Sequence, residues 1–435
     1  MTTTDTTRTA PHRASTLAGF RLVRSLTETL ASPLSAEDQT VQSMPDVSPT
    51  KWHRAHTTWF FETFLLTPEL TDYESPDPAY AYLFNSYYEQ VGSRHPRAER
   101  GVISRPTVAE VGDYRRHVDA AMETLITTVT DDVFERIEGI IEVGCHHEQQ
   151  HQELMLMDIK HVLSCNPLDP RYATRAPSSR GHATHDDRPT ETAFTTFEGG
   201  LVDIGSTGDS FAFDNETPRH TVLLAPYRIA NRVVTAGEWR AFIDDGGYSK
   251  PELWLSDGWA TVQSQGWTAP LYWHFDGEWT MFTLEGRRPV VDSEPVVHVS
   301  HYEADAFARW AGARLPTEFE WEHAATSALS SRASRPADRD VHLHPTGAPA
   351  DGIDELVQLD ADVWQWTSSA YLPYPRFEPA AGALGEYNGK FMSNQMVLRG
   401  GACITPPGHV RATYRNFFPP GARWAFSGLR LATDA

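Results

Sequence analysis

HEQQHQELMLMDIKH, residues 147–161, is the stretch that decides how the N-terminal half of this chain folds. Its pattern is that of a helix. His147 and His151 are four positions apart and therefore lie one turn from each other on one helix face, where both imidazoles can reach one metal ion. His146 lies on another face, and His161 lies far along the helix. The stretch predicts two metal ligands, although such a pair also occurs as a surface or core pair.

SPTKWHRAHTTWFFETFLL, residues 48–66, predicts the helix that supplies a third ligand. It opens with a Ser-Pro pair, which is typical of a helix start. His56 has Trp52 one turn before it and Phe60 one turn after it, so it lies on the buried aromatic stripe of this helix. We expect His56 to be the third ligand, with His53 as the second choice.

Two further helical patterns complete a bundle of four helices, in which sites are built from inward side chains on facing helices. The four expected helices are 17–30, 48–66, 111–129 and 133–163. Beyond them the chain has short apolar stretches broken by Gly, Pro and Asp, which predicts a mixed α+β region with clear helices only at 235–245 and 300–313. The expected division is a disordered tail (1–16), a helical metal-binding domain (17–165), a linker (166–195) and an α+β domain (196–435).

The composition excludes several classes of protein. Lys and Arg number 37 and Asp and Glu number 58, so the net charge is −21, which disfavours binding to nucleic acid or to an anionic membrane. No apolar run approaches the length of a membrane span, and the N-terminus lacks an export signal. Three cysteines form no disulfide framework. We therefore expect a cytoplasmic protein; its oligomeric state stays open.

The metal itself is not decided by counting ligands. The string from His147 to His151 is formally HExxH, so a zinc hydrolase with Glu148 as general base stays open, although no third ligand of that class follows downstream. Three neutral histidines would leave three positions of an octahedral ion open, which suits Fe(II) that binds both a substrate and O2. Zinc hydrolysis needs only one open position.

The chain resembles a known family over about residues 17–432. Segments 48–66 and 147–161 resemble the DinB-like helical domain of the ergothioneine-forming sulfoxide synthases, the hercynine oxygenases. The second region resembles the formylglycine-generating-enzyme-type, C-type-lectin-like domain that these enzymes carry. The matching segments there are 234–259, 294–325, 362–374 and 394–432.

The resemblance implies a non-haem Fe(II) enzyme with small-molecule substrates. It would use O2 to join a thiol sulfur to C2 of the imidazole of hercynine and leave a sulfoxide. His56, His147 and His151 fall on the iron ligands, and Gln150 falls beside the imidazole of hercynine.

The thiol is expected to be cysteine rather than gamma-glutamylcysteine. LFNSYYEQVGSRHPRAERG, residues 83–101, resembles the cysteine-using group of the family, in which Tyr87 and Tyr88 would stand near the iron as proton donors. In the other group the tyrosine comes from the second domain, which offers Tyr371 and Tyr374.

Two further sets of residues are candidates for holding the substrates. Arginine forks suit a carboxylate, although such arginines also form solvated surface faces. Aromatic faces suit the quaternary ammonium of hercynine, although these aromatics also fit a domain core. The arginines are Arg94, Arg97 and Arg100, and the ammonium candidates are Tyr414, Asn416, Phe417, Phe418 and Trp424.

The sequence also departs from the family pattern. Only Cys403 lies beyond residue 165, so the second domain lacks the cysteine pair of a formylglycine-generating enzyme. Gln365 and Ala425 replace the Glu and Gln that the family often has. A relative that uses a selenium donor or acts in ovothiol synthesis stays open, although nothing follows residue 435, where the latter usually has a methyltransferase. A zinc-dependent hydrolase or thiol transferase and a non-enzymatic ligand-binding module also stay open.

Overall fold

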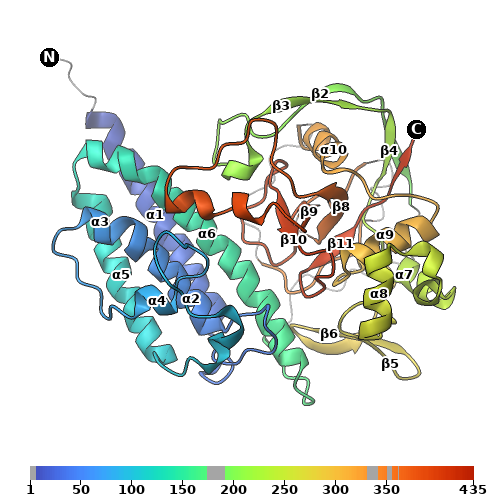
Figure 1. Cartoon of the computed structure of the whole chain (residues 1–435), viewed down its shortest axis with the longest axis horizontal. Helices are drawn as coiled ribbons and strands as arrows, with labels where there is room; N and C mark the ends of the chain where they lie inside the picture. Colours follow the sequence, from blue (N-terminus) through green and yellow to red (C-terminus); the bar gives the residue numbers. More distant parts are fainter. Residues whose placement is uncertain (1–5, 174–191, 331–340, 350–354, 361) are drawn as a thin grey trace. The chain divides into compact units, whose positions relative to one another are not determined.

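The computed structural model describes residues 6–173, 192–330, 341–349, 355–360 and 362–435. The chain forms two compact units (Figure 1). The helical unit comprises Met1–Leu168 with Ala381–Glu386, and the α+β unit comprises Asp169–Ala380 with Tyr387–Ala435. A helical region followed by a mixed α+β region confirms the predicted fold class.

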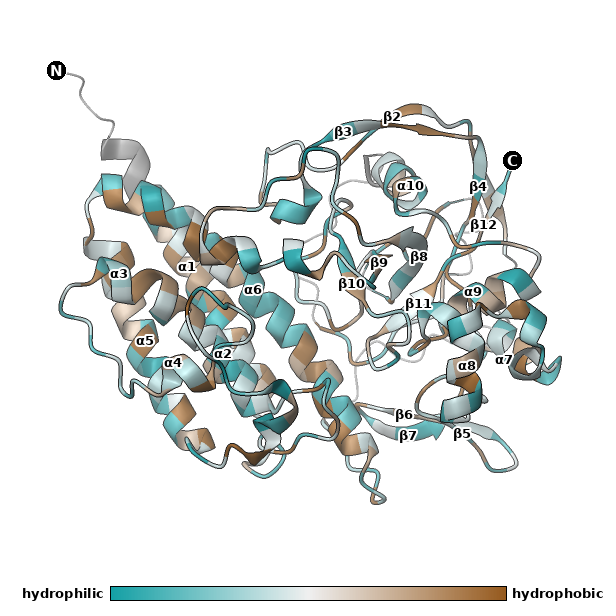
Figure 2. Cartoon of the chain, viewed as in Figure 1, coloured by the Kyte–Doolittle hydropathy of each residue, from teal (hydrophilic) through white to brown (hydrophobic). Residues whose placement is uncertain are grey.

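The helical unit is built on four long helices, and α6 packs against α1 and α2. The four predicted helices are all present. In Figure 2 apolar and polar residues alternate around them, as expected for helices that bury one face. The helices are α1 (Thr6–Ala31), α2 (Thr50–Phe61), a π-helix η1 (Glu62–Leu66), α3 (Thr67–Glu69), α4 (Tyr80–Leu83), a 3-10 helix η2 (Arg97–Val102), α5 (Val108–Thr128) and α6 (Asp131–Ser164), with the 3-10 turn η6 (Ala383–Glu386) in the later segment.

Helix α1 begins inside the stretch that was expected to be a disordered tail. It starts at Thr6, and Arg13 is anchored to the bundle, because its guanidinium donates to the carbonyl oxygen of Ile126 at 2.8 Å and pairs with Asp131 at 2.7 Å. These partners lie more than a hundred positions away in the sequence. The local pattern therefore held no sign of them.

Gly144 sets how closely α6 approaches α2. A Cβ atom at this position would lie 2.6 Å from the ring of Phe61, well inside van der Waals contact. Hydrogen at this position allows the two helices to meet one turn before His147. The same close packing brings the histidines of α6 toward those of α2.

Among the described residues of the α+β unit, the strands form four small sheets, ordered β1-β4-β12, β2-β3, β5-β6-β7 and β10-β9-β8-β11. All paired strands are antiparallel except β8 and β11, which are parallel. The strands are β1 (Phe194–Phe197), β2 (Gly200–Ile204), β3 (His220–Leu224), β4 (Tyr227–Ala230), β5 (Trp273–Phe275), β6 (Trp279–Thr283), β7 (Gly286–Pro289), β8 (Trp364–Ala370), β9 (Met396–Arg399), β10 (Asn416–Phe418), β11 (Ser427–Leu429) and β12 (Ala432–Asp434).

Helices of this unit include the two that were predicted. Capping boxes begin both of them, with Thr235 and Glu238 at α7 and Ser300 and Glu303 at α9. Helices α8 and α10 were not predicted. The helical elements are α7 (Ala236–Asp244), α8 (Ser256–Gln265), α9 (His301–Trp310) and α10 (Glu318–Ser330), with 3-10 turns η3 (Asp214–Glu216), η4 (Gly247–Ser249), η5 (Pro251–Leu253) and η7 (Gly389–Phe391).

One buried apolar cluster of the α+β unit lies between α10 and the strands β3 and β4. Trp321 of α10 packs in one buried cluster with Leu224, Tyr227 and Ile229. Most of the expected linker, 174–191, lies outside the described residues, and the expected domain limits remain predictions. In the part of the chain that the structure describes, no helix is both long and apolar enough to cross a membrane.

Candidate metal centre

Three histidines from two helices converge in the helical unit. His56 comes from α2, and His147 and His151 come from α6, with one ring nitrogen of each within 4.8 Å of the others. The Nε2 atoms of His56 and His147 are 3.2 Å apart. Two nitrogens that bind one ion at about 2.1 Å from neighbouring positions are about 3 Å apart, so this spacing suits a shared metal ion. The structure thus brings together the three residues expected as ligands.

Aromatic rings enclose the ligand on α2. His56 is fully buried and stacks between Trp52, at a centroid distance of 4.7 Å, and Trp59, at 5.6 Å. The ring of Phe60 lies 4.8 Å from that of His147. These rings keep water away from one side of the cluster and hold the imidazoles in a single orientation.

Burial keeps the three rings neutral. It lowers the pKa of His147 to about 3, although Glu148 acts in the opposite direction. Burial, reinforced by the neighbouring histidines, also lowers the pKa of His56 and His151 well below the ordinary value. Neutral imidazole is the form that binds metals, so all three residues can act as ligands at neutral pH.

A backbone carbonyl decides which nitrogen of His56 faces the cluster. The Nδ1 atom of His56 lies 2.6 Å from the carbonyl oxygen of Phe84, which can only accept, so Nδ1 carries the proton. Neutral His56 therefore presents the lone pair of Nε2 toward His147. Metal-binding histidines usually donate their other N–H in this way. The donor set thus fits a divalent first-row transition metal.

Glu148 is not available as a general base. Its side chain is fully buried and accepts hydrogen bonds from Arg24 at 2.7 Å, Arg115 at 2.8 Å and Thr27 at 2.5 Å. Burial alone would raise its pKa, but the two arginines lower it to about 2. A carboxylate held in this way is a poor proton acceptor. The HExxH string of this chain therefore has a structural glutamate in the place of a catalytic one.

Tyr87 and Tyr88 lie close to the aromatic wall of the histidine cluster, which is formed by Trp52, Trp59 and Phe60. Their rings stack at 4.7 Å, and buried Tyr88 packs 5.6 Å from Trp59, the ring that covers His56. The loop that holds them is closed by Asn85, whose Oδ1 accepts the Tyr88 N–H at 3.1 Å and whose amide group donates to the Tyr88 carbonyl oxygen at 3.0 Å.

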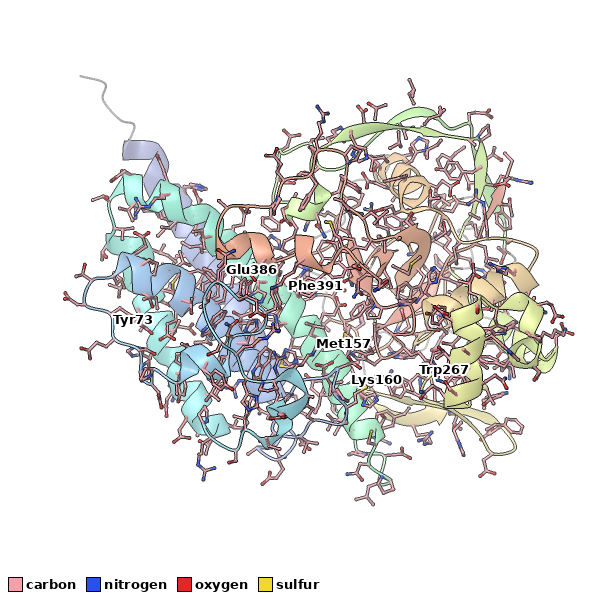
Figure 3. All side chains as sticks on the ribbon, viewed as in Figure 1. Tyr73, Met157, Lys160, Trp267, Glu386 and Phe391 are labelled. Carbon is pink, nitrogen blue, oxygen red and sulfur yellow. The ribbon has the colours of Figure 1, made fainter. Side chains whose placement is uncertain are left out.

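A carboxylate far along the sequence completes this loop. Glu386, which belongs to the helical unit and is labelled in Figure 3, accepts the backbone N–H groups of Glu89 and Gln90 at 3.0 and 2.9 Å. Nothing in the local sequence around the tyrosines indicates this partner.

The three candidate arginines differ in their surroundings. Arg100 is buried, lies over the ring of Trp52 at 3.3 Å and donates to the Ser48 hydroxyl at 2.9 Å. Burial, together with the nearby Arg97, lowers its pKa to about 8. Arg94 is exposed and pairs with Glu89, and Arg97 is exposed and donates to a backbone carbonyl. Among the described contacts of these three arginines, only those of Arg100 include a ring of the aromatic wall, Trp52.

Tyr371 and Tyr374 belong to a buried polar network of the α+β unit. The Tyr371 hydroxyl accepts from the Asn215 amide at 2.8 Å, and its ring stacks on Phe417 at 4.1 Å. The Tyr374 hydroxyl accepts from Arg399 at 3.0 Å. Burial raises the pKa of both phenols.

The remaining substrate candidates of the α+β unit also make core-like contacts. Tyr414 packs 5.3 Å from Trp364, and Phe418 lies edge-on to Trp424 at 5.6 Å. The side-chain oxygen of Asn416 accepts the backbone N–H of Phe417. In the helical unit, Gln150 is half-buried on α6.

Comparison with known proteins covers both units. Residues 20–155 match the family model of the DinB superfamily, and residues 179–435 match that of the sulfatase-modifying factor enzyme 1-like domain. A formylglycine-generating enzyme of Streptomyces coelicolor is 29% identical, covering 54% of this chain and 88% of its own length.

Two relatives match almost end to end. A hercynine oxygenase of Mycolicibacterium smegmatis is 34% identical over 90% of this chain and 92% of its own length. That of Mycolicibacterium thermoresistibile is 32% identical over 98% of this chain and 96% of its own length. These similarities run through both units, and the two family models match the helical unit and the α+β unit in turn. The protein therefore belongs to the hercynine oxygenase family of oxidoreductases.

Proposed function

We propose that this protein is an Fe(II)- and O2-dependent sulfoxide synthase of ergothioneine biosynthesis, with hercynine and cysteine as substrates. The cluster of His56, His147 and His151 supports the proposal most directly, because three neutral nitrogen ligands leave coordination positions open for a substrate and for O2. The names of the relatives support hercynine as the acceptor.

The proposed reaction balances without a further reductant. The C2–H bond of the hercynine imidazole and the S–H bond of the thiol are broken, and a C–S bond is formed. One atom of O2 becomes the sulfoxide oxygen and the other leaves as water with the two hydrogens, so the thiol and hercynine supply all four electrons. Bound at the three histidines, iron would supply the site at which O2 is activated and the sulfur is held.

The residues of the chain have separate tasks in this proposal. Neutral histidines hold the metal, and Trp52 and Trp59 shield His56 from water. Tyr87 and Tyr88 supply a proton to the reacting oxygen, as general acids positioned beside the site. In the helical unit, Gln150 would contact the imidazole of hercynine and Arg100 would hold a substrate carboxylate. In the α+β unit, the candidates for binding a trimethylammonium group are Tyr414, Asn416, Phe417, Phe418 and Trp424.

The arrangement of the tyrosines favours cysteine as the thiol. Tyr88 packs on Trp59, which covers His56, whereas Tyr371 and Tyr374 are hydrogen-bonded within the α+β unit. The free cysteines Cys145, Cys165 and Cys403 suit a reducing compartment, and we place the enzyme in the cytoplasm.

An assay with separate donor arms tests the proposal. The chain is loaded with Fe(II) without air and then incubated with O2, hercynine and either cysteine, gamma-glutamylcysteine or a selenium donor. Mass spectrometry should detect the sulfoxide of the hercynine–cysteine conjugate. Product only with another donor would reassign the substrate, and absence of product in every arm would overturn the sulfoxide synthase assignment.

A further inference from the structure

His53 lies between a metal-ligand candidate and a carboxylate. It belongs to α2, one turn before His56, and its Nδ1 atom is 2.8 Å from Nδ1 of His151. On the other side of the ring, Nε2 of His53 is 3.0 Å from Oδ2 of Asp158. His53 and Asp158 are only 3% and 2% exposed, so bulk water does not compete for these hydrogen bonds.

The side chain of Asp158 is held in place by the backbone before α2. It lies on α6 between Met157 and Lys160, which are labelled in Figure 3. Its Oδ2 atom also accepts the backbone N–H of Ser48, two residues before the start of α2, at 2.8 Å. The same carboxylate oxygen therefore accepts from the backbone before α2 and lies within hydrogen-bond distance of the His53 ring on α2.

Burial disfavours a charged ring at His53, and with His53 neutral the protons along this series of hydrogen bonds have one arrangement. Asp158 accepts, so Nε2 of His53 donates. Neutral His53 then has a lone pair on Nδ1, and Nδ1 of His151 must donate to it. The proton of His151 is therefore on Nδ1, and its Nε2 atom keeps the lone pair that a metal ion requires.

We propose that Asp158 and His53 form a hydrogen-bonded relay that selects the metal-binding tautomer of His151. Both are positioning residues, since neither would contact the metal. Phe84 does the same for His56 through one carbonyl oxygen. The inference rests on the metal centre of the proposed function, and it assigns to His53 a role outside the ligand set.

Two substitutions at one position separate the relay from simple packing. His53→Asn keeps an oxygen acceptor at the δ1 position but leaves a small cavity, whereas His53→Phe fills the space and removes the acceptor. The relay predicts that His53→Phe weakens metal affinity by about 10- to 100-fold and that His53→Asn weakens it less. A role in packing alone predicts the opposite order.

The measurement uses a single metal and a matched control. Affinity for Co(II) is measured on the full chain by competition with a chromophoric chelator. His161→Phe is the control, because it makes the same change on the helix of the ligands at a histidine whose Nδ1 atom contacts the Ser43 hydroxyl at 2.7 Å and the Cys165 sulfur at 3.9 Å, neither of them a candidate ligand. Circular dichroism and thermal unfolding confirm that each variant is folded.

A second readout follows the proton directly. Two-bond 1H–15N correlation spectra of the metal-free chain, labelled at histidine nitrogen and assigned with His151→Ala, show which ring nitrogen carries hydrogen. The wild type should show His151 protonated at Nδ1, and Asp158→Ala and His53→Phe should show Nε2-protonated or mixed forms.

Each result bears on one claim. Equal affinity of His53→Phe and wild type, tighter binding by His53→Phe than by His53→Asn, or an unchanged His151 tautomer in both variants would overturn the relay. A wild-type chain that shows the Nδ1-protonated form but binds no metal would overturn the proposed function and leave the relay standing.

Discussion

The Nδ1–H of His56 donates to the carbonyl oxygen of Phe84 across 2.6 Å, and the same ring stacks between Trp52 and Trp59. Phe84 precedes Tyr87 by three positions, so one stretch of chain holds a candidate ligand and the candidate proton donors. The orientation of the candidate metal centre and the placement of the tyrosines are thereby linked.

Removal of one ligand should remove the metal. We expect His151→Ala to lose iron and activity together, because two remaining imidazoles bind a divalent ion far more weakly than three. Iron content after loading and desalting measures this loss, with His161→Ala as a variant that keeps its iron. Full iron occupancy in His151→Ala would rule out the proposed ligand set.

Loss of a tyrosine hydroxyl should change the product rather than abolish turnover. We expect Tyr87→Phe and Tyr88→Phe to shift the ratio from C–S coupling toward simple thiol oxidation, because proton delivery to oxygen becomes slower. Mass spectrometry of both products gives the ratio. The same shift in Tyr371→Phe, with none in the first two variants, would assign the proton donor to the α+β unit.

Neutralising Glu148 should destabilise the fold. In Glu148→Gln the buried guanidinium groups of Arg24 and Arg115 lose their shared charged partner, which typically costs about 3–5 kcal/mol of unfolding free energy. Urea unfolding measures the change. Glu123→Gln removes an exposed ion pair with Arg21 and should leave the midpoint nearly unchanged. Normal stability with lost activity in Glu148→Gln would favour the general-base role instead.

Any side chain at position 144 should destabilise the helical unit. We expect Gly144→Ala to lower the free energy of unfolding by about 1–3 kcal/mol, because its Cβ would meet the ring of Phe61. Gly139→Ala lies on the same helix with open space around it and should raise stability by about 0.5–1 kcal/mol through helix propensity. Equal effects of the two substitutions would show that α6 can move away from α2.

Acid should unfold the metal-free chain through its buried histidines. The folded pKa of His147 is lowered to about 3, so the unfolded chain binds a proton near the ordinary value while the folded chain does not. Stability is therefore fully present above about pH 6.5 and is lost as pH falls from there toward 3, by about 1.4 kcal/mol per pH unit for this one group. His56 and His151 act in the same direction.

Urea midpoints measured between pH 7 and pH 5 test this dependence. The decline should be shallower in His147→Asn, which has one titrating group fewer. A decline of the same steepness in that variant would attribute the acid sensitivity to other groups.

The spacing of residues in the sequence was sufficient to find the three histidines of the candidate site and the helices that carry them, but not α8 or α10. Periodicity and capping are local, so the ranges around α2, α5 and α6 and the capping boxes of α7 and α9 follow from neighbouring residues. His147 and His151 share a helix face by spacing alone, and the aromatic neighbours of His56 indicated its burial. The start of α1 at Thr6 did not follow, because Arg13 finds its partners across the bundle.

The roles of the residues around those histidines depend on the tertiary structure. Asp158 is seven positions after His151, two helical turns on the same face, which is the one local sign of the relay. Glu148 has the position of a general base in the string, yet Arg24 and Arg115 from other helices hold it as a buried ion pair.

The sequence by itself determined the helical pattern, the candidate ligands and the family, because these follow from spacing and from residue types in order. Only the tertiary structure decided which partners the ring nitrogens of His56 and His53 meet and which carboxylates are held in buried ion pairs. The physical reason is that a proton position or a charge in a buried site is set by partners within about 3 Å, and chain folding brings those partners together from distant positions.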